Sequence, residues 1–186
     1  MTALGGKVLQ IADSLKYVRE LTGHNDHPMI DRILAYMGLP KGLSWCLAFA
    51  VFCYGSAAAP VKNPLPRIAR CSLFWETCQG NEFRYKTVSA EDVRWGAEQL
   101  LPGDVGIFSH HPNRKNWDGH AVLVVRQDSP RTFQTIEGNT VGVASQNAAE
   151  QRGEGGTRAQ GVFYRTRYTD GKGGLYFEGA VRPRRS

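Results

Sequence analysis

The feature that most constrains this chain is an apolar run from Gly42 to Gly55 with a cysteine near its start. Nearly every residue of the run is apolar, so the pattern predicts a helix that is enclosed on most sides. Ser44 is a good N-cap and Gly55 is a stop signal, which together place Cys46 in the first turn. A thiol there lies near the positive end of the helix dipole, which favours the thiolate, and free N–H groups nearby can bind an oxyanion. The next question is whether the chain supplies a base for Cys46.

Helical patterns precede strand patterns along the sequence. Apolar spacing predicts three further helices, over 7–21, over 28–37 with Asp26 as the cap, and over 67–78. The segment 81–100 is ambiguous, with a short helical turn near Ser89 and a packed Trp95. From Leu101 the pattern changes to short apolar strands, expected at 105–109, 120–126, 131–137, 140–144, 161–168 and 175–182.

Turn signals separate these strands. Gly138-Asn139 is a hairpin-type dipeptide, and 146–160 is polar and glycine-rich, which is typical of a mobile loop. Helices first and strands after predict an α+β fold in which N-terminal helices pack on an antiparallel β-sheet. No repeat or linker interrupts the sequence, so we expect one domain over 1–186, acting as a monomer.

Two polar residues of the strand region are suited to serve Cys46. His120 begins a valine-rich strand and Glu137 ends the next one, an interval long enough for two adjacent antiparallel strands and their turn. The imidazole is then expected beside the carboxylate. A cysteine nucleophile needs this arrangement, a base next to the sulfur and a third group that orients the base. Asn139 is a competing or assisting orienter.

Four sequence blocks resemble the signature blocks of a CHAP domain, a member of the NlpC/P60-like, papain-related cysteine peptidases and amidases. They are Ser-Trp-Cys-Leu-Ala-Phe-Ala at 44–50, Pro-Gly-Asp-Val-Gly-Ile-Phe at 102–108, Gly-His-Ala-Val-Leu-Val-Val at 119–125 and Ile-Glu-Gly-Asn-Thr at 136–140. The resemblance covers roughly residues 40–145, with the blocks in the family's order and spacing, and it implies a papain-like fold. Residues 1–37 lie outside these blocks, and no wall-binding module is recognisable after residue 145.

The resemblance also implies roles for individual residues. Cys46 is the expected nucleophile, His120 the base, Glu137 the carboxylate orienter and Asn139 a supporting residue. The implied reaction is hydrolysis of an amide bond in bacterial peptidoglycan, either between muramic acid and L-alanine or within the stem or cross-bridge peptide. Beside the Cys46 N–H, Ser44 and Asn139 are candidates for the second oxyanion donor. We expect Ser44, Trp45 and Trp117 at the substrate groove, although packing in the core is an equal interpretation of Trp45.

We expect no cofactor and no metal. Some CHAP domains carry an aspartate-rich calcium loop before the cysteine, whereas 38–45 contain no acidic residue here. His110 and His111 lack the spacing of common zinc motifs, and His24 and His27 fit a solvated turn. The other three cysteines, Cys53, Cys71 and Cys78, are interpreted as small buried packing residues, because a disulfide from Cys53 is disfavoured in a reducing compartment.

Charge and hydropathy bear on the partner and on location. The net charge is +6, which draws a protein to polyanions such as an acidic cell wall. Neither a nucleic-acid motif nor a basic stripe with interleaved aromatic residues is present, so nucleic acid is not an expected partner. Met1 to Leu21 lacks the apolar core of a secretory signal, and no apolar run spans a membrane. We expect synthesis in the cytoplasm and action on the wall after release or secretion.

Two other functions fit the same residues. One is a cysteine amidase of the same fold that acts on a small amide or peptide outside the wall. The other is a non-catalytic binding protein that keeps the fold, which an intact set of Cys46, His120 and Glu137 disfavours.

Overall fold

The computed structural model describes residues 3–111, 118–142 and 160–184, and the fold over these ranges is α+β, as predicted. The helical region comes first and the strands follow, apart from one short helix between the first two strands. The elements in chain order are α1 (Ala3–Ser14), α2 (Pro28–Tyr36), α3 (Cys46–Ala58), α4 (Cys71–Gln79), β1 (Tyr85–Ser89), α5 (Ala90–Arg94), β2 (Val105–Ser109), β3 (Gly119–Ser129), β4 (Thr132–Val141), β5 (Gln160–Tyr168) and β6 (Tyr176–Pro183).

Within the described ranges, six strands form one open antiparallel sheet in the order β1-β6-β2-β3-β4-β5. The three central neighbours β2, β3 and β4 follow one another in sequence, whereas β6 returns to lie between β1 and β2. This order places β3 beside β4, the two strands that the sequence predicted to carry a base and its carboxylate partner.

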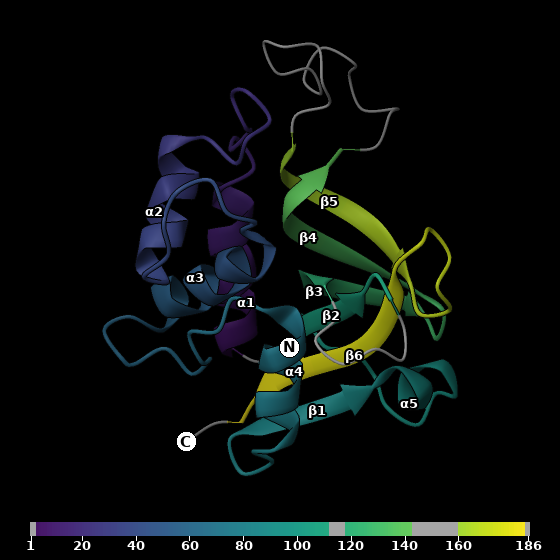
Figure 1. The fold of residues 1–186 in the computed structure, drawn as a ribbon. Helices are drawn as coiled ribbons and strands as arrows, with labels where there is room; N and C mark the ends of the chain where they lie inside the picture. The colour runs from purple at the N-terminus through teal and green to yellow at the C-terminus, as the bar shows by residue number, and fades with distance from the viewer. Residues whose placement is uncertain (1–2, 112–117, 143–159, 185–186) are drawn as a thin grey trace.

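Alternate residues of the central strands are buried on opposite faces of the sheet. Val105, Ala121 and Leu123 belong to the core shared with the first four helices, whereas Val122 and Val124 belong to a second core with an aromatic cluster. Figure 1 shows α1, α2 and α3 grouped on one side of the sheet and α5 beside β1. The sheet is thus covered on both faces, which explains why its central strands are continuous apolar runs.

Helix α3 is the buried element that the apolar run predicted, with eight of its thirteen residues buried. Its ends differ from the prediction. Ser44 is not the N-cap, because Trp45 occupies that position and no side chain caps the helix. Gly55 does not end the helix, which continues to Ala58. A Cβ at Gly55 would collide with the Tyr36 hydroxyl, so this glycine permits the close packing of α2 against α3.

Two other predicted helices begin or end elsewhere. α1 ends at Ser14, because tight turns replace the helix and Arg19 forms a bridge with Gly161. Leu15 and Val18 are nevertheless buried. α4 begins at Cys71 rather than at residue 67.

The cap of α2 and the packing of Trp95 also differ from the predictions. His27, not Asp26, caps α2, and its imidazole accepts a hydrogen bond from the Met29 N–H. The predicted turn at Ser89 is confirmed as the start of α5. The expectation that Trp95 packs is wrong, since it is 81% exposed. It follows buried Val93 by two residues, which turns it to the opposite side of the short helix.

Gly138-Asn139 is not a hairpin turn, which corrects another expectation. β4 runs from Thr132 to Val141 without a turn, and its register against β5 shifts between Glu137 and Thr140, where the two residues form a bulge. Asn139 has a φ of 57°, a left-handed conformation that occurs in one class of β-bulge. The loop predicted over 146–160 falls outside the described residues, except for Gln160. None of the described helices is long and apolar enough to cross a bilayer.

Candidate active site

Three elements bring the predicted centre together. Cys46 is the first residue of α3, His120 is the second residue of β3 and Glu137 lies in β4 just before the bulge. Helix α3 packs against both strands, so the Cys46 sulfur lies next to the sheet at the start of β3. All three side chains are buried, Cys46 and His120 with less than a tenth of their surface exposed and Glu137 with none.

The imidazole of His120 is held by the carboxylate of Glu137. Nε2 lies 2.8 Å from Oε2 of Glu137, and the other ring nitrogen, Nδ1, is therefore the one free to meet Cys46. Burial alone lowers the pKa of His120. The hydrogen bonds and opposite charges of Cys46 and Glu137 outweigh burial and raise this pKa to about 9. The imidazolium form is favoured at neutral pH.

The Cys46 sulfur is surrounded by hydrogen-bond donors. The largest effect comes from the Cys71 thiol, which lowers the pKa of Cys46, and His120 and the Ala121 N–H lower it further. Together they overcome the opposing effect of burial, so the pKa of Cys46 lies well below that of an ordinary thiol. The N-terminus of the thirteen-residue α3 adds its positive dipole end. Cys46 and His120 are thus poised as a thiolate–imidazolium pair.

The neighbouring cysteines have the opposite character. The hydrogen bond to Cys46 and burial raise the pKa of Cys71 well above the usual range, so its thiol stays protonated and donates to Cys46. Burial alone raises the pKa of Cys53, and it raises that of Cys78 to about 12. All four cysteines are free thiols. One thiol of the set is therefore expected to be nucleophilic at neutral pH.

Glu137 has three side-chain partners. Arg167 on β5 binds it with two N–H groups, from Nε to Oε1 at 2.7 Å and from Nη2 to Oε2 at 2.5 Å. The Thr135 hydroxyl donates to Oε1 at 2.5 Å. Burial raises the pKa of Glu137, but Arg167 first and His120 second reverse this effect and lower it to about 2. The orienting carboxylate is therefore a fixed anion.

The remaining predicted residues are distributed differently. Asn139 lines the same cavity as Cys46 and His120 but does not hold the imidazole, and its buried Oδ1 has no hydrogen-bond partner among the described residues. Ser44 lies exposed at the cavity's edge. Trp45 is fully buried and its indole N–H donates to Glu20 at 3.3 Å, so it packs in the core rather than lining the groove. Trp117 lies outside the described residues.

Sequence reasoning missed three residues of this centre. Arg167 and Thr135 hold Glu137, and Cys71 donates to Cys46. Arg167 and Thr135 come from β5 and β4, and their roles depend on which strands are neighbours. Cys71 meets Cys46 because α3 and α4 both begin at a cysteine and their first turns come together. The sequence carried no signal for this contact, because the predicted helix began at residue 67 and placed Cys71 in its second turn.

The reactive groups open onto a cavity of about 460 Å³, a size typical of ligand sites. Cys46, His120 and Asn139 line it together with Arg165 and Arg167. The cavity therefore gives a substrate access to the sulfur from the side on which the imidazole and two arginines lie.

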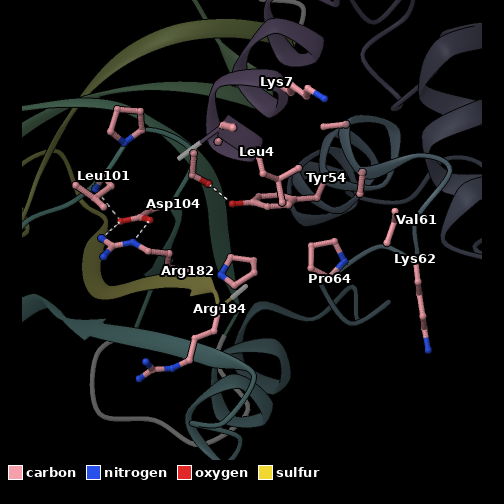
Figure 2. Close-up of a pocket in the computed structure, with 17 residues that line it drawn as sticks. Leu4, Lys7, Tyr54, Val61, Lys62, Pro64, Leu101, Asp104, Arg182 and Arg184 are labelled. Atoms are coloured by element: carbon pink, nitrogen blue, oxygen red, sulfur yellow. Dashed lines mark hydrogen bonds and ion pairs between the residues drawn. The ribbon is translucent and has the colours of Figure 1, made fainter. Parts of the chain in front are cut away.

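A second cavity, of about 390 Å³, shares no lining residue with the first. Figure 2 shows two polar contacts at this cavity: the Tyr54 hydroxyl donates to the Gly103 carbonyl at 2.6 Å, and Arg182 binds both oxygens of Asp104 at 2.7 Å. These contacts connect α3 and β6 to the turn before β2. No nucleophile with a base lines this cavity in the described part of the chain, so it is not the reaction centre.

No group of three or more histidine, cysteine or acidic side chains with the geometry of a metal site occurs in residues 3–111, 118–142 and 160–184. Comparisons with protein-family models, with curated proteins and with solved structures found no match. The assignment of a function therefore depends on the chemistry of the centre and on the sequence blocks that carry it.

Proposed function

We propose that this protein is a cysteine hydrolase that cleaves an amide bond, with Cys46 as nucleophile, His120 as acid and base, and Glu137 as orienter. One observation carries the proposal: the thiol, the imidazole and the carboxylate form an unbroken chain of contacts that ends at a cavity. A buried thiolate–imidazolium pair is a costly arrangement for a structural role, whereas amide hydrolysis uses both members.

The reaction follows from the positions of the protons. The Cys46 thiolate attacks the carbonyl carbon, and the resulting oxyanion is stabilised by the free N–H groups of the first turn of α3, with the Cys46 N–H as the first donor. His120 gives its proton to the departing amine, and the C–N bond breaks to leave a thioester. Neutral His120 then takes a proton from water, and the hydroxide attacks the thioester to release the acid and restore the thiolate.

We further propose that the fold is the papain-like fold of CHAP domains and that the substrate is the peptide of bacterial peptidoglycan. The four sequence blocks support this substrate class, and the net charge of +6 favours contact with an anionic wall. In this proposal the protein is made in the cytoplasm and reaches the wall by release or secretion. The bond cleaved is either the muramoyl–L-alanine amide or a peptide bond of the stem or cross-bridge.

The test is hydrolysis of purified peptidoglycan by the wild type and by Cys46→Ala. We expect the wild type to clear a wall suspension and release new amino termini, identified by mass spectrometry, and Cys46→Ala to do neither. Cys53→Ala is the matched control on the same helix and should remain active if it folds. Undiminished hydrolysis by Cys46→Ala would overturn the mechanism. Cleavage of small amides but not of the wall would instead favour an amidase with another substrate.

A further inference from the structure

Two arginines of β5 line the cavity at Cys46, and their guanidinium groups have different hydrogen-bond partners. Arg165 and Arg167 lie two residues apart on the strand, so their side chains share one face of the sheet. Arg167 is bound to Glu137 through two hydrogen bonds. Arg165 donates from Nη1 to the Val141 carbonyl at 2.8 Å, and its other N–H groups have no hydrogen-bond partner in the described part of the chain.

Among the described residues, the charges around the cavity do not balance. The Cys46 thiolate and the His120 imidazolium cancel, as do Glu137 and Arg167. Arg165 contributes a further positive charge, and no acidic side chain lines the cavity within the described ranges. Arg165 is also half-buried, so water solvates this charge incompletely. A partly desolvated guanidinium with free donors is a site for a carboxylate, which its fork-shaped geometry fits.

A second unfilled hydrogen-bonding position lies on the same cavity. The Oδ1 atom of Asn139 is buried and accepts no hydrogen bond from the described residues. Buried polar atoms normally have a partner, so an N–H group of a ligand that reached this oxygen would be stabilised by it. A ligand that carries both a carboxylate and a peptide N–H satisfies Arg165 and Asn139 together.

We propose that Arg165 determines specificity by binding a substrate carboxylate close to the scissile amide bond. The inference rests on the proposed hydrolase function and narrows its substrate class to acidic peptides. Arg167 cannot take this role, because Glu137 occupies its guanidinium. Arg165 therefore selects the substrate, whereas Arg167 fixes the orienting carboxylate.

Peptide affinity tests this inference without turnover, so the result is independent of the hydrolysis test. The probes are the peptide L-alanyl-γ-D-glutamyl-L-lysine, which has a free carboxylate at its middle residue, and the same peptide with that group as a carboxamide. Both are titrated calorimetrically into Cys46→Ala protein. We expect the carboxylate peptide to bind about 10- to 100-fold more tightly, as one charged hydrogen-bonded pair allows.

Three variants in the Cys46→Ala background distinguish the outcomes. Arg165→Gln should bring the ratio of the two affinities close to one, and Arg165→Lys should retain part of it. Arg126→Gln, which removes an exposed charge on β3, should leave the ratio unchanged. Thermal unfolding checks that Arg165→Gln is folded despite the lost contact with Val141. The inference would be overturned if folded Arg165→Gln preferred the carboxylate peptide as strongly as the parent protein does, or if the parent protein showed no preference. Inactivity toward the wall would bear only on the proposed function.

Discussion

Cys46, His120 and Glu137 titrate as one unit, because each of them contacts the next and shifts its pKa. The pKa of Glu137 is about 2, so it stays ionised down to that pH, and the pKa of His120 is about 9, so it stays protonated up to that pH. The pKa of Cys46 is lowered by its hydrogen-bond donors. The reactive form therefore exists between the pKa of Cys46 and that of His120. Arg167 makes this possible, since a buried carboxylate without a cation would take up a proton instead.

This arrangement predicts a broad pH profile that depends on Glu137. We expect kcat/KM to fall on the acid side as Cys46 is protonated and on the alkaline side near pH 9 as His120 loses its proton. Glu137→Gln removes an anion that raises the pKa of His120, so the alkaline limb should move to lower pH and kcat should fall on the order of 100-fold. Rates of hydrolysis measured across pH test this shift.

Alkylation of Cys46 by iodoacetamide reads the same chemistry without a substrate. Wild-type Cys46 should react at neutral pH, whereas Cys53, Cys71 and Cys78 should not, because their pKa values are raised. Glu137→Gln should slow this reaction at pH 6 to 7, because the lower pKa of His120 leaves less imidazolium to stabilise the Cys46 thiolate. An alkaline limb and an alkylation rate that are unchanged in Glu137→Gln would contradict the coupling.

At this scale the sequence indicated the residues that lie at the ends of predicted elements. Cys46, His120 and Glu137 were predictable because each lies at the start or end of a predicted element, and the structure brings them together, although Glu137 lies within β4. Arg167 was not predictable, since its role depends on β5 pairing with β4 and on a register that places it near Phe133. Trp45 was ambiguous because an aromatic residue beside a nucleophile fits both a groove and a core.

At the scale of elements, the separation of α3 from β4 sets the position of the sulfur. Gly138, in the β4 bulge, packs closely against the start of α3. A Cβ at this residue would lie 2.5 Å from Cζ3 of Trp45 and 2.8 Å from the Phe49 ring. Both rings are fully buried and cannot yield without movement of the helix. Since Cys46 follows Trp45, any such movement displaces the nucleophile.

We therefore expect Gly138→Ala to reduce activity and stability together. Overpacking of this kind costs about 1–3 kcal/mol, and displacement of the sulfur from His120 should lower kcat more than it raises KM. Urea unfolding and steady-state kinetics measure the two effects. Gly80→Ala is the control, because a Cβ there would lie an ordinary 3.4 Å from the Glu76 carbonyl. Normal kinetics in Gly138→Ala would show that the gap between α3 and β4 does not control the centre.

Most element types were predictable, apart from β1 in the ambiguous segment 81–100, and the junctions between elements were not. The long apolar run predicted α3, and the short apolar and valine-rich runs predicted β2 and β3. Gly138-Asn139 has the composition of a turn, but β5 pairs with β4 on both sides of it, so tertiary pairing overrides the local signal. The helical spacing after Ser14 likewise survives as buried side chains on an irregular backbone.

At the scale of the whole molecule, the proposed catalytic residues come from two halves that share one core. The helical half supplies Cys46 and the sheet supplies His120 and Glu137. The larger hydrophobic cluster joins residues of α1 to α4 with residues of β2, β3, β4 and β6, and Cys46 itself belongs to it. The second cluster uses the opposite face of the same strands. Each half would expose its side of the larger cluster if the other were removed, which predicts a single cooperative unit.

Urea unfolding tests this prediction with a probe in each half. Cys53 is fully buried in α3, so its alkylation reports the opening of the helical half, and amide hydrogen exchange of β3 reports the sheet. We expect both to share one midpoint with tryptophan fluorescence, to which buried Trp45 and Trp75 contribute. If Cys53 becomes reactive at lower urea than β3 loses protection, the chain consists of two units. The contact between Cys46 and His120 would then lie at a domain interface, and its geometry would depend on docking rather than on folding.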